Sequence, residues 1–231
     1  MKASILLLLS LMALNAAAQS GPPALCKPCL FYGGDLNPGD PSANAYPNMY
    51  TLALPDTRVY AAIRLPAGHS VIVTGILFQI QISGAPKLDP KGAAWEIRSG
   101  LGDGANGGTL IAFGQVGAAV EPTGRTLNYP EFTVAVKVNP PVQLDGGRKG
   151  TTYWFNVEPP CVNTHDPDCN QLSQQYFVSN TTQQTNSVRG ALQPVGDAFI
   201  YSSNEVYRYD WVNLCALGQG CDYLSFGVMG K

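Results

Sequence analysis

Hydrophobic and polar residues alternate along several short stretches of this 231-residue chain. In residues 78–82 a phenylalanine and two isoleucines alternate with glutamines, and residues 132–139 alternate Phe and Val with mostly polar side chains. A two-residue period predicts β-strands that turn one face to the core and the other to water. From about Tyr50 strand patterns dominate, and further strands are expected at 30–32, 59–65, 95–98, 109–116, 152–157, 198–202, 206–212 and 223–228, between Gly, Pro, Asn or Asp residues.

The breaks between these stretches indicate the fold class. The chain has 25 Gly and 18 Pro and shows no helical stripe, apart from a short helical turn expected at 171–177. Many short strands with turns between them predict an all-β, jelly-roll-like antiparallel β-sandwich in a single domain with long loops. We expect a signal peptide at 1–18, an irregular Gly/Pro/Asn-rich leader at 19–48 and the sandwich at 49–231, with a disulfide-pinned loop region at about 159–196.

The beginning of the chain indicates where the protein works. Lys2 is followed by an apolar run at 5–14 that is too short to span a bilayer, and then by three alanines that suit signal peptidase. Cleavage is expected between Ala18 and Gln19. No second apolar run approaches membrane-spanning length, so the sequence predicts a secreted protein without a membrane span.

Six cysteines lie beyond the expected cleavage site, in three close pairs. An even number of cysteines in an exported chain predicts disulfides, although six allow about fifteen pairings. We expect local pairing. The first pair also has the spacing of a thiol redox motif, but no helix follows it, so a structural bond is favoured. The expected bonds are Cys26–Cys29, Cys161–Cys169 and Cys215–Cys221.

Charge and histidine content restrict the function classes. Only 13% of residues are charged and the net charge is −2, so no electrostatic field favours nucleic acid. The two histidines do not lie in a recognisable catalytic motif: His69 falls in a turn, and no Gly-x-Ser-x-Gly elbow is found near it. No catalytic residue is therefore assigned, and no enzyme activity is expected.

Metal and cofactor sites are also not expected. His165 lies between Cys161 and Cys169, but oxidation of those cysteines would remove the thiolates that zinc needs. Oxygen ligands for calcium are offered by two Gly-rich stretches, where Asp and Asn residues more simply form their own turn bonds. These stretches contain Asp35, Asn37 and Asp40 in one case and Asp103 and Asn106 in the other.

Carboxylates are scattered along the chain, at Glu96, Glu121, Glu131, Glu158 and Glu205. A glycoside hydrolase needs two carboxylates about 5 to 10 Å apart across a cleft, and the spacing of these residues indicates no such pair. Glu96 and Arg98 share one face of a strand, which predicts an exposed, salt-paired edge.

An aromatic row gives the best candidate for binding. In a strand, Tyr207, Tyr209 and Trp211 would share one face, with charged residues on the other. Such a row can stack on sugar rings, or it can belong to the core. Trp95 and Trp154 are expected in the core, and the pattern leaves open whether Trp154 or its neighbours Tyr153 and Phe155 face inward.

Several motifs together resemble a group of uncharacterised secreted bacterial proteins, some of which carry a C-terminal PEP-CTERM sorting segment. The motifs are Tyr-Gly-Gly-Asp at 32–35, Trp-Glu-Ile-Arg-Ser-Gly at 95–100, Gly-Gly-Thr-Leu-Ile-Ala at 107–112 with Gly114, Pro-Thr-Gly-Arg at 122–125, and Tyr-Trp at 153–154 with Val157. The resemblance covers most of the chain and implies an extracellular β-sandwich, without assigning a reaction. This chain lacks the sorting segment and has the cysteine-bounded loops in addition.

Three functions are compatible with these features. The first is a secreted, non-catalytic protein that binds a glycan or an extracellular matrix component through the aromatic row, without a cofactor. The second is a structural or adhesive extracellular protein without a small ligand, and the third is a weak glycan hydrolase. A solvent-exposed aromatic row beside a groove favours the first, a flat surface with that row buried favours the second, and two carboxylates that face each other across a cleft favour the third.

Overall fold

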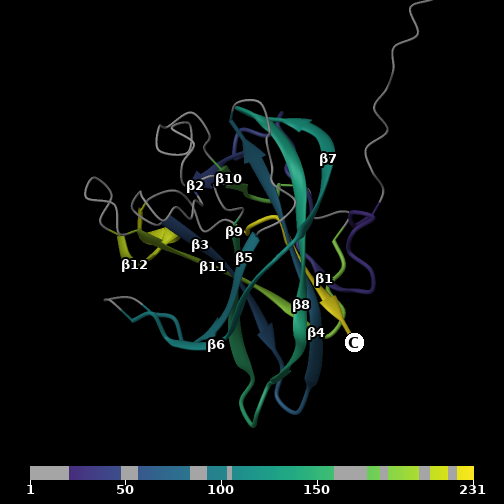
Figure 1. Ribbon diagram of the computed structural model, residues 1–231. Coiled ribbons are helices and arrows are strands. Elements are labelled where there is room, and N and C mark those ends of the chain that lie inside the picture. Colours follow the sequence, from purple (N-terminus) through teal and green to yellow (C-terminus); the bar gives the residue numbers. More distant parts are fainter. Residues whose placement is uncertain are drawn as a thin grey trace, which may run out of the picture.

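The chain forms an antiparallel β-sandwich, as the strand pattern predicts, with two sheets packed face to face (Figure 1). The structure is a computed structural model. It describes residues 21–47, 57–83, 93–102, 106–158, 176–182, 187–202, 209–217 and 223–231.

The first sheet has seven strands built around the long β4. Strand β8 pairs along most of one side of β4, and β7 pairs with β8 beyond it. On the other side of β4, β13 and β10 pair with successive parts of the strand and are followed by β1 and β2. The strands are β1 (Cys29–Tyr32), β2 (Ala45–Pro47), β4 (Ser70–Ile82), β7 (Ala118–Thr126), β8 (Pro130–Asp145), β10 (Tyr176–Ser179) and β13 (Phe226–Gly230).

The second sheet has six strands in the order β12-β11-β3-β9-β5-β6. All of its pairs are antiparallel, and a short 3-10 helix, η2 (Leu214–Leu217), follows β12. The strands are β3 (Thr57–Leu65), β5 (Ala93–Ser99), β6 (Thr109–Val116), β9 (Thr151–Glu158), β11 (Gln193–Ser202) and β12 (Tyr209–Asn213). Residues 109–126 therefore run from the edge of one sheet directly to the edge of the other.

Alternating side chains of both sheets fill the core between them. Phe78 and Ile80 of β4 and Ile63 of β3 are fully buried there, as is Trp95 of β5. Burial of this kind stabilises a sandwich by about 25 cal/mol per Å² of apolar surface removed from water. On β9 the inward positions are Tyr153, Phe155 and Val157, whereas Trp154 lies in a separate hydrophobic cluster on the outer face of the six-stranded sheet.

The expectation that the polar residues between the core positions of β4 face water is wrong. Gln79 and Gln81 are fully buried, because other parts of the chain cover the outer face of the seven-stranded sheet. Gln79 accepts a hydrogen bond from the Thr133 hydroxyl at 3.0 Å, and the Gln81 amide donates to the Ser179 hydroxyl at 3.3 Å. The glutamines thus fill a buried polar layer.

Much of that cover comes from the segment that was expected to form an irregular leader. Its residues 21–47 belong to the sandwich: they supply β1, at the predicted place, and β2. Tyr32 is fully buried against Leu77 and Met229 on the outer face. The predicted disulfide between Cys26 and Cys29 is present, with Cα atoms 4.8 Å apart, and holds the segment before β1.

Other expectations from the sequence fall partly or wholly outside the described residues. The helical turn expected at 171–177 is wrong at its end, since Tyr176 and Phe177 belong to β10. Several features expected from the sequence lie outside the described residues: the signal peptide, Asp103, Cys161, His165, Cys169, Glu205 and Cys221. Cys215 lies in η2, but its side chain is not described. Their predicted roles and pairings stay predictions.

Candidate functional site

The predicted aromatic row is described at one of its three side chains. Tyr207 lies outside the described residues, and Tyr209 starts β12 without a described side chain. Trp211 is described and partly buried. A ligand-binding role for the three residues stays a prediction.

Trp211 sits at a β-bulge in a left-handed backbone conformation. Ser202 of β11 pairs with Tyr209, and Ile200 pairs with Val212, so β12 has one residue more than its partner between these pairs. Trp211 has φ of 57°, and no other described residue except glycines has a positive φ. A bulky residue in this region is strained, and strain of this kind concentrates at functional sites. The bulge also interrupts the regular alternation that the sequence predicts for this strand.

The bulge lays the indole of Trp211 on the outer face of the six-stranded sheet. Its ring centroid is 5.0 Å from that of Tyr201 and 5.4 Å from that of Tyr60. The guanidinium carbon of Arg98 lies 4.9 Å from the centre of the indole, a cation–π contact. A β-carbon at Gly107 would come within 2.8 Å of the indole, so the absence of a side chain there makes room for the ring.

Trp211, Tyr60 and Tyr201 form an aromatic cluster, and Glu96 connects the charged groups next to it. One of its oxygens accepts hydrogen bonds from the Tyr60 hydroxyl and from Arg98 Nε, each at 2.7 Å. The other oxygen accepts from Arg58 Nη1 at 2.5 Å. The predicted pairing of Glu96 with Arg98 is correct. The prediction that the pair forms an exposed edge is wrong, because β5 lies between β9 and β6 and the two side chains are 15% and 16% exposed.

A second carboxylate joins the cluster from the neighbouring strand. Glu158 of β9 is buried, and its Oε1 lies 3.3 Å from Arg58 Nε. The register pairs Glu158 with Ala94 and Glu96 with Asn156, which places the two glutamates diagonally across β5 and β9. The Glu-x-Arg pattern of β5 can be seen in the sequence, but the pairing of β5 with β9 cannot. The position of Glu158 beside Glu96 could therefore not be predicted.

Burial and charge shift the ionisation of two groups here. The pKa of the Tyr60 hydroxyl is raised well above its ordinary value, first by burial and then by the nearby carboxylates of Glu96 and Glu158. Burial alone lowers the pKa of Arg98, but its contacts with Glu96 and Tyr60 outweigh that effect and raise it. Tyr60 therefore stays neutral and Arg98 stays charged. The charged residues described here are two arginines and two glutamates, so their charges balance.

Other predicted site residues serve the fold. Asp35, a calcium candidate, is buried, accepts a hydrogen bond from Tyr32 and lies 2.8 Å from Arg125 Nη2. Arg125 Nε also lies 2.6 Å from Glu131, so these residues form a buried ionic cluster on the outer face of the seven-stranded sheet. Because Tyr32, Asp35 and Arg125 all belong to the motifs that carried the family resemblance, those motifs meet in space.

The remaining oxygen-ligand candidates form turns. The side chains of Asn37, Asp40 and Asn106 each accept a hydrogen bond from the backbone N–H two residues further on, at 2.8 to 3.1 Å. This is the turn chemistry that the sequence favoured over calcium. His69 is exposed, with its Nδ1 3.1 Å from the Ala67 carbonyl. Across the described ranges, no three His, Cys, Asp or Glu residues are grouped so that they could hold a metal ion.

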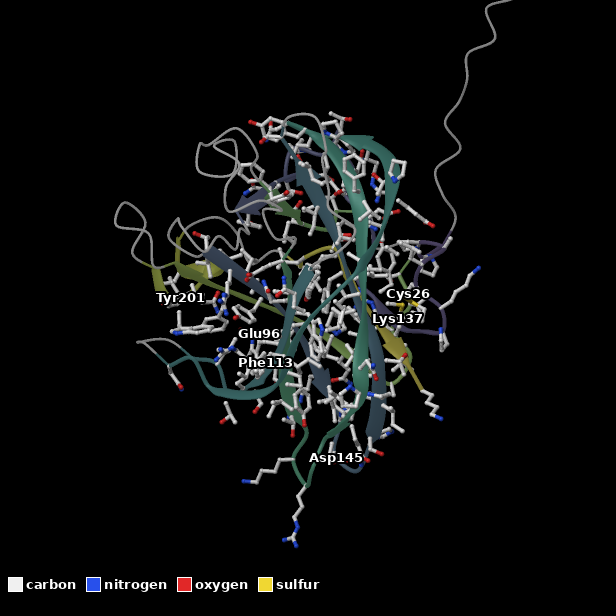
Figure 2. All side chains as sticks on the ribbon, in the orientation of Figure 1. Cys26, Glu96, Phe113, Lys137, Asp145 and Tyr201 are labelled. Carbon is white, nitrogen blue, oxygen red and sulfur yellow. A yellow bond between two sulfur atoms is a disulfide. The ribbon has the colours of Figure 1, made fainter. Side chains whose placement is uncertain are left out.

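No residue of the aromatic cluster lines the cavity that is found among the described residues. That cavity, of about 10 Å³, has room for about one water molecule and is lined by Phe31, Ala62 and Tyr223 among others. Phe113 of β6 is 72% exposed and pairs with Glu96, so it lies on the same outer face (Figure 2). Tyr201 and Glu96 lie on this side of the molecule, away from Cys26 and Lys137 (Figure 2).

Comparisons with known proteins give one distant structural likeness. No family model matches the chain, and no curated protein matches it. The chain is similar to a solved structure of the cysteine protease and lectin-like domains of a surface layer associated protein of Clostridium difficile. The identity is 13% and the TM-score is 0.38, over 82% of this chain and 36% of that one. This chain thus spans little more than a third of that chain.

Proposed function

We propose that this protein is an exported glycan-binding module whose ligand stacks on the indole of Trp211. The observation that carries the proposal is the position of this ring, partly exposed at a strained backbone bulge. Tyr201, Tyr60 and Arg98 hold the ring in place on the outer face of the six-stranded sheet. A ring fixed before binding loses little conformational entropy when a ligand stacks on it.

The surroundings of Trp211 favour an uncharged glycan. Aromatic rings supply apolar contact to sugar faces, while the indole N–H and tyrosine hydroxyls can bond sugar hydroxyls. Because Arg58 and Arg98 are both paired with glutamates, the described residues of the cluster offer no unbalanced charge to a sulfate or carboxylate. We therefore propose neutral hexose-containing chains as the ligand class.

The test is a glycan array with the mature protein in its oxidised form, followed by calorimetric titration of any hit. We expect Trp211→Ala to lose binding by at least about tenfold, which corresponds to about 1.4 kcal/mol. Tyr129→Ala is the matched control, because Tyr129 is also partly buried and stacks on another ring, Phe177, on the other sheet at 5.6 Å. It should bind as the parent protein does. Absence of any glycan binding, or equal loss in both folded variants, would reject the proposal.

A structural or adhesive role is the second candidate, and a different observation favours it. Strand β6 presents Leu110, Ile111 and Phe113 to solvent at the edge of its sheet. Exposed apolar edges of this kind mark surfaces that contact other protein chains. If the glycan array gave no binding while the protein associated with itself, the structural role would become the better account.

None of the helical segments in the described ranges is long and apolar enough to cross a bilayer. Export itself rests on the charged and apolar pattern of residues 1–18. The Cys26–Cys29 disulfide agrees with an oxidising compartment. N-terminal sequencing of the protein recovered from culture medium would test both export and the expected cleavage between Ala18 and Gln19.

A further inference from the structure

Strand β6 combines a free sheet edge with exposed apolar side chains. Leu110 is 40% exposed, Ile111 41% and Phe113 72%, and these are the exposed large hydrophobic residues of the described chain. All three belong to one strand of eight residues. Their concentration in one short segment distinguishes it from the scattered apolar exposure that any protein surface has.

The backbone of β6 is open on one side. The strand ends the order of the six-stranded sheet, and among the described strands it pairs only with β5. In Figure 1 it lies at the rim of the sandwich, at the lower left of the view. Alternate N–H and C=O groups along its outer side therefore lack a partner strand, which makes the edge a template for another strand.

The sequence gives β6 little of the protection that edge strands usually carry. Natural edges are guarded by charges, by prolines and by bulges. Residues 109–120 contain no charged residue and no proline, and only a register shift beside Arg98 interrupts the pairing with β5. The edge of the other sheet is different, since β7 carries Glu121, Pro122 and Arg125.

We propose that β6 pairs antiparallel with β6 of a second copy of this chain, which joins the two six-stranded sheets into one. A two-fold axis sets the same segment against itself, so each copy offers the other an identical neutral strand without like charges in opposition. Because Phe113 shares a face with Glu96, the two Phe113 side chains come to lie on the same side of the joined sheet. Their contact removes the most exposed ring of each copy from water.

Sedimentation equilibrium over a concentration series tests the association. The mature parent protein should form a dimer of twice the monomer mass. Phe113→Lys should be monomeric at the same concentrations while it keeps the parent circular dichroism spectrum. Ala119→Lys is the matched control, because it adds the same charge at an exposed position on the edge strand of the other sheet, and it should dimerise as the parent does.

Hydrogen exchange then distinguishes strand pairing from adhesion through a single ring. Amides of residues 109–116 that point outward should exchange at least about tenfold more slowly in the dimer than in the monomer, whereas amides of β7 should not change. A parent protein that stays monomeric, a dimer that Phe113→Lys leaves intact, or a dimer without slower exchange in β6 would each overturn the proposal. The glycan-binding variants do not enter this test, so its failure leaves that proposal untouched.

Discussion

The indole of Trp211 faces the guanidinium of Arg98, whose central carbon lies 4.9 Å from the ring centre. The two residues come from β12 and β5, which three strands separate in the sheet order. The contact is possible because the bulge places the Trp211 side chain across the outer face of the six-stranded sheet, and the Arg98 side chain extends from the same face. Arg98 also donates from Nη1 to the Gly107 carbonyl at 2.9 Å, and so it ties the loop before β6 to the aromatic cluster.

Replacement of Arg98 should loosen this cluster. We expect Arg98→Ala to lower the free energy of unfolding by about 2 kcal/mol, because it removes a partly buried ion pair and a cation–π contact, while Glu96 keeps Tyr60 and Arg58 as donors. Urea denaturation measures the change, and tryptophan fluorescence reports the release of the indole. Arg64→Ala serves as control: Arg64 is exposed on β3 and donates to the Lys149 carbonyl, so its loss should stay within about 0.5 kcal/mol. Equal effects of the two substitutions would show that the cluster adds no stability.

The backbone at Trp211 predicts an unusual order of stability for two small replacements. Both Trp211→Ala and Trp211→Gly remove the ring, but only glycine adopts a φ of 57° without steric cost. We expect the glycine variant to be the more stable of the two by about 1 kcal/mol. At Val212, which pairs regularly with Ile200, the order should reverse, because glycine weakens an ordinary strand position. Thermal or chemical denaturation of the four variants gives both differences, and an alanine variant at 211 that is as stable as the glycine variant would contradict the left-handed backbone.

The sequence allowed the fold class and most strand positions to be predicted, since these depend on local alternation and on turn residues. It did not show which residues meet across strands. Glu96 and Glu158 are 62 positions apart in the sequence. Both form ion pairs with Arg58 only because β5 pairs with β9 and β9 pairs with β3. Gln79 and Gln81 were expected in water because nothing local to β4 reveals that another segment covers it. The bulge at Trp211 is likewise fixed by pairing with β11 rather than by the residues around it.

Gly114 should tolerate no side chain. It pairs with Trp95, and a β-carbon there would lie 2.9 Å from the indole atoms of that fully packed core residue. Because Trp95 is only 2% exposed and is surrounded by core side chains, it has little space into which to move. We expect Gly114→Ala to cost about 1 to 3 kcal/mol in the free energy of unfolding. Gly39→Ala is the control, since its β-carbon would meet its nearest neighbour, an Asn37 oxygen, at an ordinary 3.5 Å. A stable Gly114→Ala variant would mean that Trp95 repacks.

The hydroxyl of Tyr176 predicts a pH-dependent loss of stability in the alkaline range. Burial raises the pKa of this group to about 12, and the hydroxyl has no hydrogen-bond partner within the part of the chain that the structure describes. An unfolded tyrosine ionises near pH 10. Between about pH 10 and 12 the unfolded chain therefore releases a proton that the folded protein retains, and the free energy of unfolding falls as pH rises, by up to about 1.4 kcal/mol per pH unit from this residue.

Tyr176→Phe should remove that contribution, so that the free energy of unfolding of the variant falls less steeply above pH 10 than that of the parent. At pH 7 the same variant should be more stable than the parent by about 1 kcal/mol, because it relieves an unpaired buried hydroxyl. Tyr32→Phe provides the contrast. The pKa of Tyr32 is also raised, by burial and by Asp35, but its hydroxyl donates to Asp35 and accepts from Gln79, so its removal should destabilise the protein at pH 7. Denaturant titrations from pH 7 to about 11.5 measure these effects. If Tyr176→Phe were destabilising at pH 7 with an unchanged slope above pH 10, its hydroxyl would have to make a stabilising bond in the folded protein.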